Sequence, residues 1–168
     1  MYLPTLVADD FEIPALSTDR YRLEPLTNRW VLHDFAAITE SFSHIDGLIL
    51  PPGSLPAEGT YTLETNVLEL AWHEREFGAR HSFAFAAITH DDQREVGCMY
   101  VYPSMHPDYD AVGCSWARWD PEDPGADVRF FEEFRSWISA AWPFARVAYP
   151  GRSIPWPEWL TSATSESM

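Results

Sequence analysis

The chain has 168 residues, the length of a single domain, and 46% of them are hydrophobic, which predicts a packed core and excludes a disordered or fibrous chain. Its 26 acidic residues outnumber 11 basic ones, so the formal net charge is -15 at pH 7. Such a surface repels nucleic acids and anionic membranes, and we expect neither as a partner. Cationic small molecules are the ligands that this charge favours.

The sequence carries no signal for export or membrane insertion. The first residues lack the basic and apolar regions of a signal peptide, and no segment approaches the ~20 apolar residues of a spanning helix. We expect the two cysteines, Cys98 and Cys114, to be buried thiols of a reducing compartment. These features predict a cytoplasmic protein.

The chain divides into three segments. Residues 1 to 19 mix prolines and acids with scattered apolar residues, which predicts an irregular leader. Residues 20 to 160 form one α/β domain. Residues 161 to 168 are polar, and we expect a flexible tail.

The first half of the domain predicts one strand and two helices. Alternation over residues 21 to 26 indicates a short strand. A helix should begin with Asn28 as its N-cap and end near Gly47. A second helix should begin after Thr62 and end at Gly78. The apolar stripes of these helices comprise Val31, Phe35, Ile38 and Phe42, and then Leu63, Val67, Leu70 and Phe77.

The second half predicts a sheet crossed by one more helix. Apolar runs over residues 82 to 89 and 96 to 102 indicate buried strands, and a third strand spans residues 111 to 119. One face of that third strand carries only Gly113, Ser115 and Ala117. A small-residue face admits either a ligand or a closely packed helix.

An amphipathic helix should begin near Asp127 and stop before Pro143, followed by a last strand over residues 145 to 149. The strands before and after this helix should be parallel and joined by a right-handed crossover. The aromatic tract at residues 154 to 160 predicts a clasp over the core, with a partner surface as the alternative.

This order of elements, together with the phrases at residues 21 to 26, 95 to 103 and 142 to 147, resembles the GNAT-type N-acetyltransferases, as a divergent bacterial member. The resemblance covers about residues 20 to 152. It implies a GNAT-like mixed central sheet flanked by helices. The helix and two strands that close the family's fold are expected to be missing or cut short.

The resemblance also implies acetyl-CoA as co-substrate, lying where the last two parallel strands separate. Its pyrophosphate would sit on the amides that open the following helix, because helix N-termini hold anions. The residues implied for this cofactor are Trp116, Ala117, Arg118, Glu122, Gly125, Ala126, Asp127 and Arg129.

Acetyl or acyl transfer to an amine needs a base for the ammonium proton and an acid for the leaving thiolate. Ser115, Tyr149 and Tyr102 are the catalytic candidates, each of which also reads as a polar residue at a sheet margin. The predicted acceptor is an amine of a small cationic molecule or of a peptide. We also expect a homodimer.

The alternative is a GNAT-like binding or regulatory module that no longer binds CoA and has no catalytic activity. In the loop where the family has its pyrophosphate motif, only Gly125 matches, and the carboxylates of Glu122 and Asp127 would repel a pyrophosphate. The acids and histidines around residues 90 to 92 and 106 to 110 are typical of turns, so we expect no metal site.

Overall fold

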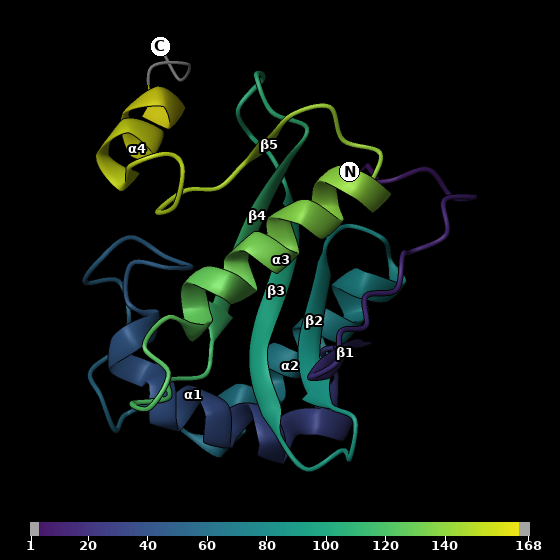
Figure 1. The fold of residues 1–168 in the computed structure, drawn as a ribbon. Coiled ribbons are helices and arrows are strands. Elements are labelled where there is room, and N and C mark those ends of the chain that lie inside the picture. Colours follow the sequence, from purple (N-terminus) through teal and green to yellow (C-terminus); the bar gives the residue numbers. More distant parts are fainter. Residues whose placement is uncertain (1–3, 165–168) are drawn as a thin grey trace.

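The computed structural model describes residues 4 to 164, and a five-stranded sheet lies at its centre (Figure 1). In spatial order the strands are β1 (Tyr21–Pro25), β2 (Phe83–Thr89), β3 (Glu95–Pro103), β4 (Ala111–Ala117) and β5 (Val147–Ala148). The helices are η1 (Asn28–Trp30), α1 (Val31–Ile45), α2 (Leu63–Gly78), α3 (Ala126–Ala141) and α4 (Trp156–Thr164).

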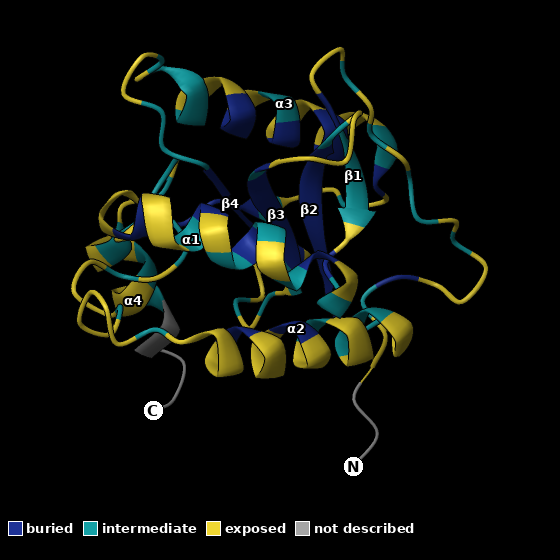
Figure 2. Ribbon diagram, turned by 90° about the horizontal axis from the view of Figure 1, so that it is seen from below, coloured by how far each residue is buried: buried dark blue, intermediate teal, exposed yellow. Residues whose placement is uncertain are grey.

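The described residues form three layers, with α3 on one face of the sheet and α1 and α2 on the other (Figures 1 and 2). The first four strands pair in antiparallel fashion, and β4 pairs with β5 in parallel. The predicted mixed sheet and its parallel crossover are thereby confirmed. No helix within residues 4 to 164 is long and apolar enough to cross a bilayer.

The helix boundaries agree with the prediction, but two details differ. Thr62 caps α2 by accepting a hydrogen bond from the Thr65 amide at 3.2 Å, as expected. The first turn of the preceding helix is capped by Thr27 and not by Asn28. The predicted stripe of α2 is confirmed at Leu70, which is buried, but it is wrong at Leu63 and Val67, which are 37% and 38% exposed, whereas Asn66 is fully buried.

The burial of Asn66 has a polar cause. Its side-chain amide donates to the Val31 carbonyl at 3.4 Å, and its oxygen lies 2.9 Å from the Tyr61 hydroxyl, whose one proton it shares with Glu69. A buried polar group that finds partners is tolerated in a core. Apolar periodicity treats Asn as an outward-facing residue. It therefore places Val67, and not its neighbour Asn66, on the buried face of α2.

The C-terminal part of the domain differs most from the prediction. The last strand contains only two residues, and the tract at residues 154 to 160, expected to be a clasp over the core, enters the helix α4 at Trp156. The Trp156 indole donates to the Gly47 carbonyl at 2.7 Å, which ties α4 to the end of α1. Residues 161 to 164 of the predicted flexible tail belong to α4, and residues 165 to 168 lie outside the described residues.

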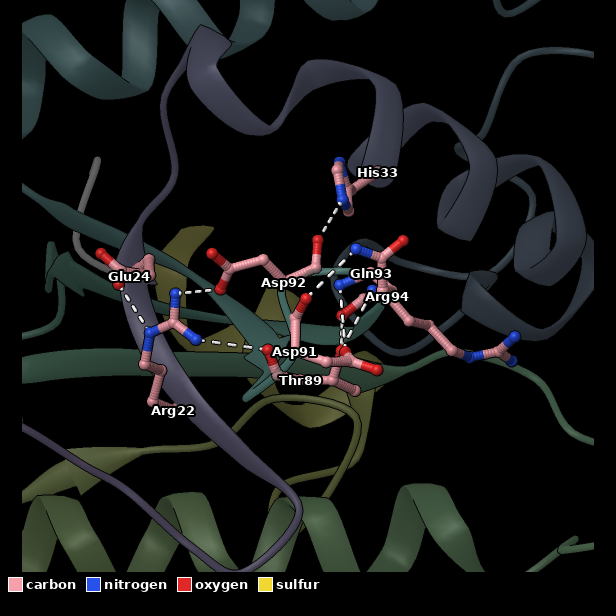
Figure 3. A network of polar contacts seen from close by, with 8 residues as sticks. All are labelled: Arg22, Glu24, His33, Thr89, Asp91, Asp92, Gln93 and Arg94. Carbon is pink, nitrogen blue, oxygen red and sulfur yellow. Dashed lines mark hydrogen bonds and ion pairs between the residues drawn. The ribbon is translucent and has the colours of Figure 1, made fainter.

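A polar network fixes the β2–β3 turn against β1 and α1 (Figure 3). Arg22 donates to the Asp92 carboxylate at 2.5 Å and to the Thr89 carbonyl at 3.2 Å. His33 of α1 contacts the Asp92 carbonyl at 2.8 Å. Asp91 accepts from the Thr89 hydroxyl at 2.6 Å. Asp91 thus has the local turn role that the sequence predicted for residues 90 to 92, whereas the Asp92 carboxylate binds Arg22 of β1.

Gly97 of β3 lies directly against the backbone of β4. Its φ is +156°, and a Cβ atom there would lie 2.4 Å from the Trp116 carbonyl oxygen. We expect Gly97→Ala to destabilise the fold by about 1–3 kcal/mol, measured by urea unfolding. The reason is that the Trp116 oxygen belongs to the backbone and cannot move aside as the end of a flexible side chain can. The control is Gly78→Ala at the end of α2, where a Cβ meets nothing within 4 Å. Equal stability of the two variants would contradict this assignment.

Candidate functional site

The parallel strands β4 and β5 separate after two residue pairs. Ala111 pairs with Val147 and Val112 with Ala148, and β4 then continues to Ala117 without β5 beside it. The predicted divergence of these strands is therefore confirmed. It leaves one backbone edge of β4 beyond Val112 without a partner strand.

The small residues of β4 face α3. A Cβ atom at Gly113 would lie 2.5 Å from the Tyr149 ring and 3.0 Å from the Phe134 ring. Ser115 is fully buried on the same face, and its hydroxyl has no hydrogen-bond partner among the described residues. Of the two roles that the sequence left open for this face, the structure shows helix packing.

The opposite face of β4 borders an apolar cavity of about 880 Å³. The cavity lies between α2, the loop that follows α1, the end of the β3–β4 hairpin and α4. Val112 and Cys114 line it from β4, and Pro150 lines it from the chain just after β5. Its aromatic walls come from Trp72, Tyr100, Tyr102, His106, Trp156 and Trp159. We call this cavity the aromatic pocket.

Three polar side chains of α2, Thr65, Glu69 and His73, also line the aromatic pocket, each one helical turn from the next. Glu69 is the one carboxylate among the described lining residues, and it accepts a hydrogen bond from the Tyr61 hydroxyl at 2.5 Å. Burial lowers the pKa of His73 to about 4, so its ring is neutral at pH 7. Aromatic walls with one carboxylate suit an organic cation, because ring faces and carboxylates both attract positive charge.

The three catalytic candidates do not converge. Tyr102 lines the aromatic pocket, and burial raises its pKa above the ordinary value, so that its hydroxyl keeps its proton. Ser115 and Tyr149 lie on the α3 face of the sheet, where the Tyr149 ring packs against Phe131. The sequence predicted Ser115 and Tyr149 near the strand divergence and gave Tyr102 as a further possibility, and the sheet separates Tyr102 from the other two.

Two residues implied for the cofactor are engaged elsewhere in the fold. The Trp116 indole is buried on the α1 and α2 face and donates to the Tyr100 hydroxyl at 3.0 Å. Arg118 forms two hydrogen bonds to the Glu40 carboxylate of α1, at 2.7 and 2.5 Å. Neither side chain points a free polar group into the gap between β4 and β5.

The acidic loop before α3 satisfies its own backbone. The Glu122 amide donates to the Asp120 carboxylate at 2.9 Å, and the Ala126 amide donates to the Asp123 carbonyl at 3.1 Å. Arg129 is paired with the Asp123 carboxylate. Gly125, the residue that matches the family's motif, stands as N-cap of α3 without a side chain to offer. These amides and this cation are therefore already committed.

The free edge of β4 is bonded to protein side chains. The Ala117 amide donates to the Asp127 carboxylate at 3.0 Å, and Arg152 donates to the Ser115 carbonyl at 3.0 Å. A pantetheine arm laid along β4 would need these same backbone groups. As the side chains stand, the residues present do not fit acetyl-CoA in the gap.

A buried acidic cluster that the sequence did not predict lies between α1 and β3. The Cys98 thiol is 3.4 Å from an Asp34 oxygen and 3.1 Å from a Glu95 oxygen. All three side chains are buried, and their ligand-type atoms lie within 4.8 Å of one another. Desolvation raises the pKa of Asp34, of Glu95 and of Cys98. These shifts favour the protonated, uncharged forms of the three groups in the core.

This raised pKa of Glu95 predicts a pH-dependent penalty. The unfolded chain releases the Glu95 proton near its ordinary pKa while the folded chain retains it, so stability falls as pH rises above about 4.5. We expect Glu95→Gln to match the wild type near pH 4 and to become progressively more stable than it toward pH 8, in urea unfolding. Glu74→Gln, at an exposed position of α2, is the control. A constant difference across this range would contradict the prediction.

Comparison with known proteins relates the fold to acetyltransferases. No protein-family model and no curated protein matches the sequence. The structure resembles the ribosomal-protein-S5-alanine acetyltransferase of Vibrio fischeri, with a TM-score of 0.62 and 12% identity over 91% of this chain and 81% of that one. It also resembles a protein of Bordetella pertussis assigned to the GnaT-family acetyltransferases, with a TM-score of 0.53 and 13% identity over 74% and 72%. The chain has the GNAT acetyltransferase fold.

Proposed function

We propose that the protein is an N-acyltransferase whose acceptor is an amine bound in the aromatic pocket. One observation carries this proposal: the wall of the pocket is built at the point where β4 and β5 separate, by Val112, Cys114 and Pro150. An acceptor amine in the pocket would thus lie beside the gap. The resemblance to proteins named acetyltransferases supports acyl transfer as the type of reaction.

The acceptor that suits this pocket is an amine with an apolar body. Aromatic side chains such as Trp72 and Trp159 can pack against that body, and their ring faces attract a cation. The Glu69 carboxylate would pair with the ammonium group. The net charge of -15 adds a long-range attraction for cations. A small cationic molecule and a peptide amine both have this chemistry.

The amine must lose a proton before its nitrogen can bond to an acyl carbon. We propose that the Glu69 carboxylate accepts this proton. It lies in the pocket and already accepts a hydrogen bond from the Tyr61 hydroxyl. Tyr102, which lines the pocket together with Tyr100, could donate a proton to the leaving thiolate, because its raised pKa keeps its hydroxyl protonated. We further propose a cytoplasmic location, supported by two buried free thiols, Cys98 and Cys114.

A second candidate is a binding module that takes up the amine without transferring an acyl group. The specific observation in its favour is the closed edge of β4, where Asp127 and Arg152 occupy the backbone groups of the gap. The two candidates share the aromatic pocket and its ligand. They differ in whether the protein ever binds an acyl donor.

The pocket is tested by Glu69→Gln. We expect this variant to bind an aromatic alkylamine such as tryptamine about tenfold more weakly than the wild type, measured by titration calorimetry, because hydrogen bonds to a charged group contribute about 1.5–3 kcal/mol. Glu64→Gln, in the first turn of the same helix and outside the pocket, should bind like the wild type. Equal affinity of the Glu69 variant and the wild type would place the amine elsewhere.

The reaction is tested with the wild type, tryptamine and acetyl-CoA. Mass spectrometry should detect the N-acetylated amine. Acetyl-CoA at 100 times its Kd should stabilise the fold by about 2.7 kcal/mol. If the protein binds the amine but neither acetylates it nor is stabilised by acetyl-CoA, the result favours the binding module.

A further inference from the structure

We infer that Asp127 and Arg152 form an internal plug in the gap between β4 and β5, and that this pair determines whether an acyl donor can bind. The inference rests on the proposed function, since it concerns access to the same site. The plug consists of these two side chains alone. They come from the first turn of α3 and from the turn that follows β5.

The plug uses the backbone groups that an extended ligand would use. The Ser115 carbonyl and the Ala117 amide point into the gap. Arg152 donates to this carbonyl and Asp127 accepts from this amide, each at 3.0 Å. An extended chain that adds to a strand edge pairs through these same main-chain donors and acceptors. The plug and a pantetheine arm therefore exclude each other along this stretch of β4.

The two side chains of the plug hold each other in place. Arg152 donates two hydrogen bonds to the two oxygens of Asp127, at 2.6 and 3.1 Å. The Arg152 side chain is only 11% exposed, and its guanidinium lies 4.8 Å above the Phe131 ring. Bidentate charged pairs of this kind are strong and geometrically specific. A ligand that opens the gap must first separate this pair.

The turn after β5 aims Arg152 at the gap. Gly151 has a φ of +78°, which a residue with a side chain rarely adopts, and a Cβ there would lie 2.5 Å from the Gly47 carbonyl. The Arg152 amide donates to the Tyr149 carbonyl at 3.1 Å and closes the turn. The position of Arg152 is thus a property of the backbone, so the plug is formed before any ligand arrives.

The exposed face of α3 offers a matched control pair. Glu132 and Arg135 also form an ion pair, at 3.7 Å, but their side chains are 54% and 52% exposed, and neither is among the residues implied for the cofactor. Replacing either pair removes one acid and one base, so the net charge does not change. A difference between the two double variants therefore reports the place of the pair and not the charge of the protein.

The experiment measures acetyl-CoA binding by titration calorimetry in the wild type, in Asp127→Ser/Arg152→Ala, and in Glu132→Ser/Arg135→Ala. We expect the plug variant to bind at least tenfold more tightly than the wild type, and the control variant to bind like the wild type. Asp127→Asn keeps an oxygen for the Ala117 amide and loses the charged pair. It should fold even where the double variant does not, and bind more tightly than the wild type by a smaller factor.

The outcomes separate the plug from the proposed function. If the wild type binds acetyl-CoA as tightly as the plug variants, the plug is overturned and acyl transfer stands. If no folded variant binds acetyl-CoA, the plug is overturned together with the acyl donor, and the binding module remains. Circular dichroism and urea unfolding establish which variants are folded.

Discussion

The turn that ends β5 is the constraint on which the rest of the site depends. Pro150 lacks an N–H group and cannot extend the ladder with β4. Gly151 then bends the chain in a left-handed conformation beside the Gly47 carbonyl. This turn limits the parallel pairing to two residues, places Pro150 in the wall of the aromatic pocket and directs Arg152 into the gap. A longer β5 would close the gap beside β4, and it would displace both Pro150 from the pocket wall and Arg152 from the plug.

Alternation along β4 divides the site between two faces of the sheet. Successive side chains of a strand point to opposite sides. Gly113 and Ser115 therefore pack under α3, while Val112 and Cys114 line the aromatic pocket. Residues that are neighbours in sequence near the divergence thus belong to separate environments. Chemistry on an acceptor amine has to come from the pocket face, because the opposite face is filled by α3 and by the Tyr149 ring.

The sequence predicts those parts of this structure that depend on nearby residues. The cap at Thr62 and the crossover through α3 follow from local pattern, and both are confirmed. The plug joins residues 25 positions apart, and the Asp34–Cys98 contact joins residues 64 apart. No local pattern encodes such pairings, since they form only when whole elements pack. A polar side chain that finds a partner in the core, as Asn66 does, also defeats a prediction based on hydrophobicity.

Charge acts on the two ligands of the proposed reaction in opposite directions. The surplus of acids attracts an amine, while the acidic loop before α3 repels an anionic donor. Salt screens exposed charges such as that of Glu122, so high ionic strength weakens that repulsion. It does little to Arg152, which is nearly buried and hydrogen-bonded to backbone and carboxylate alike. If salt alone does not admit acetyl-CoA and loss of the plug does, the barrier to the donor is the occupied edge of β4 and not the acidity of the protein.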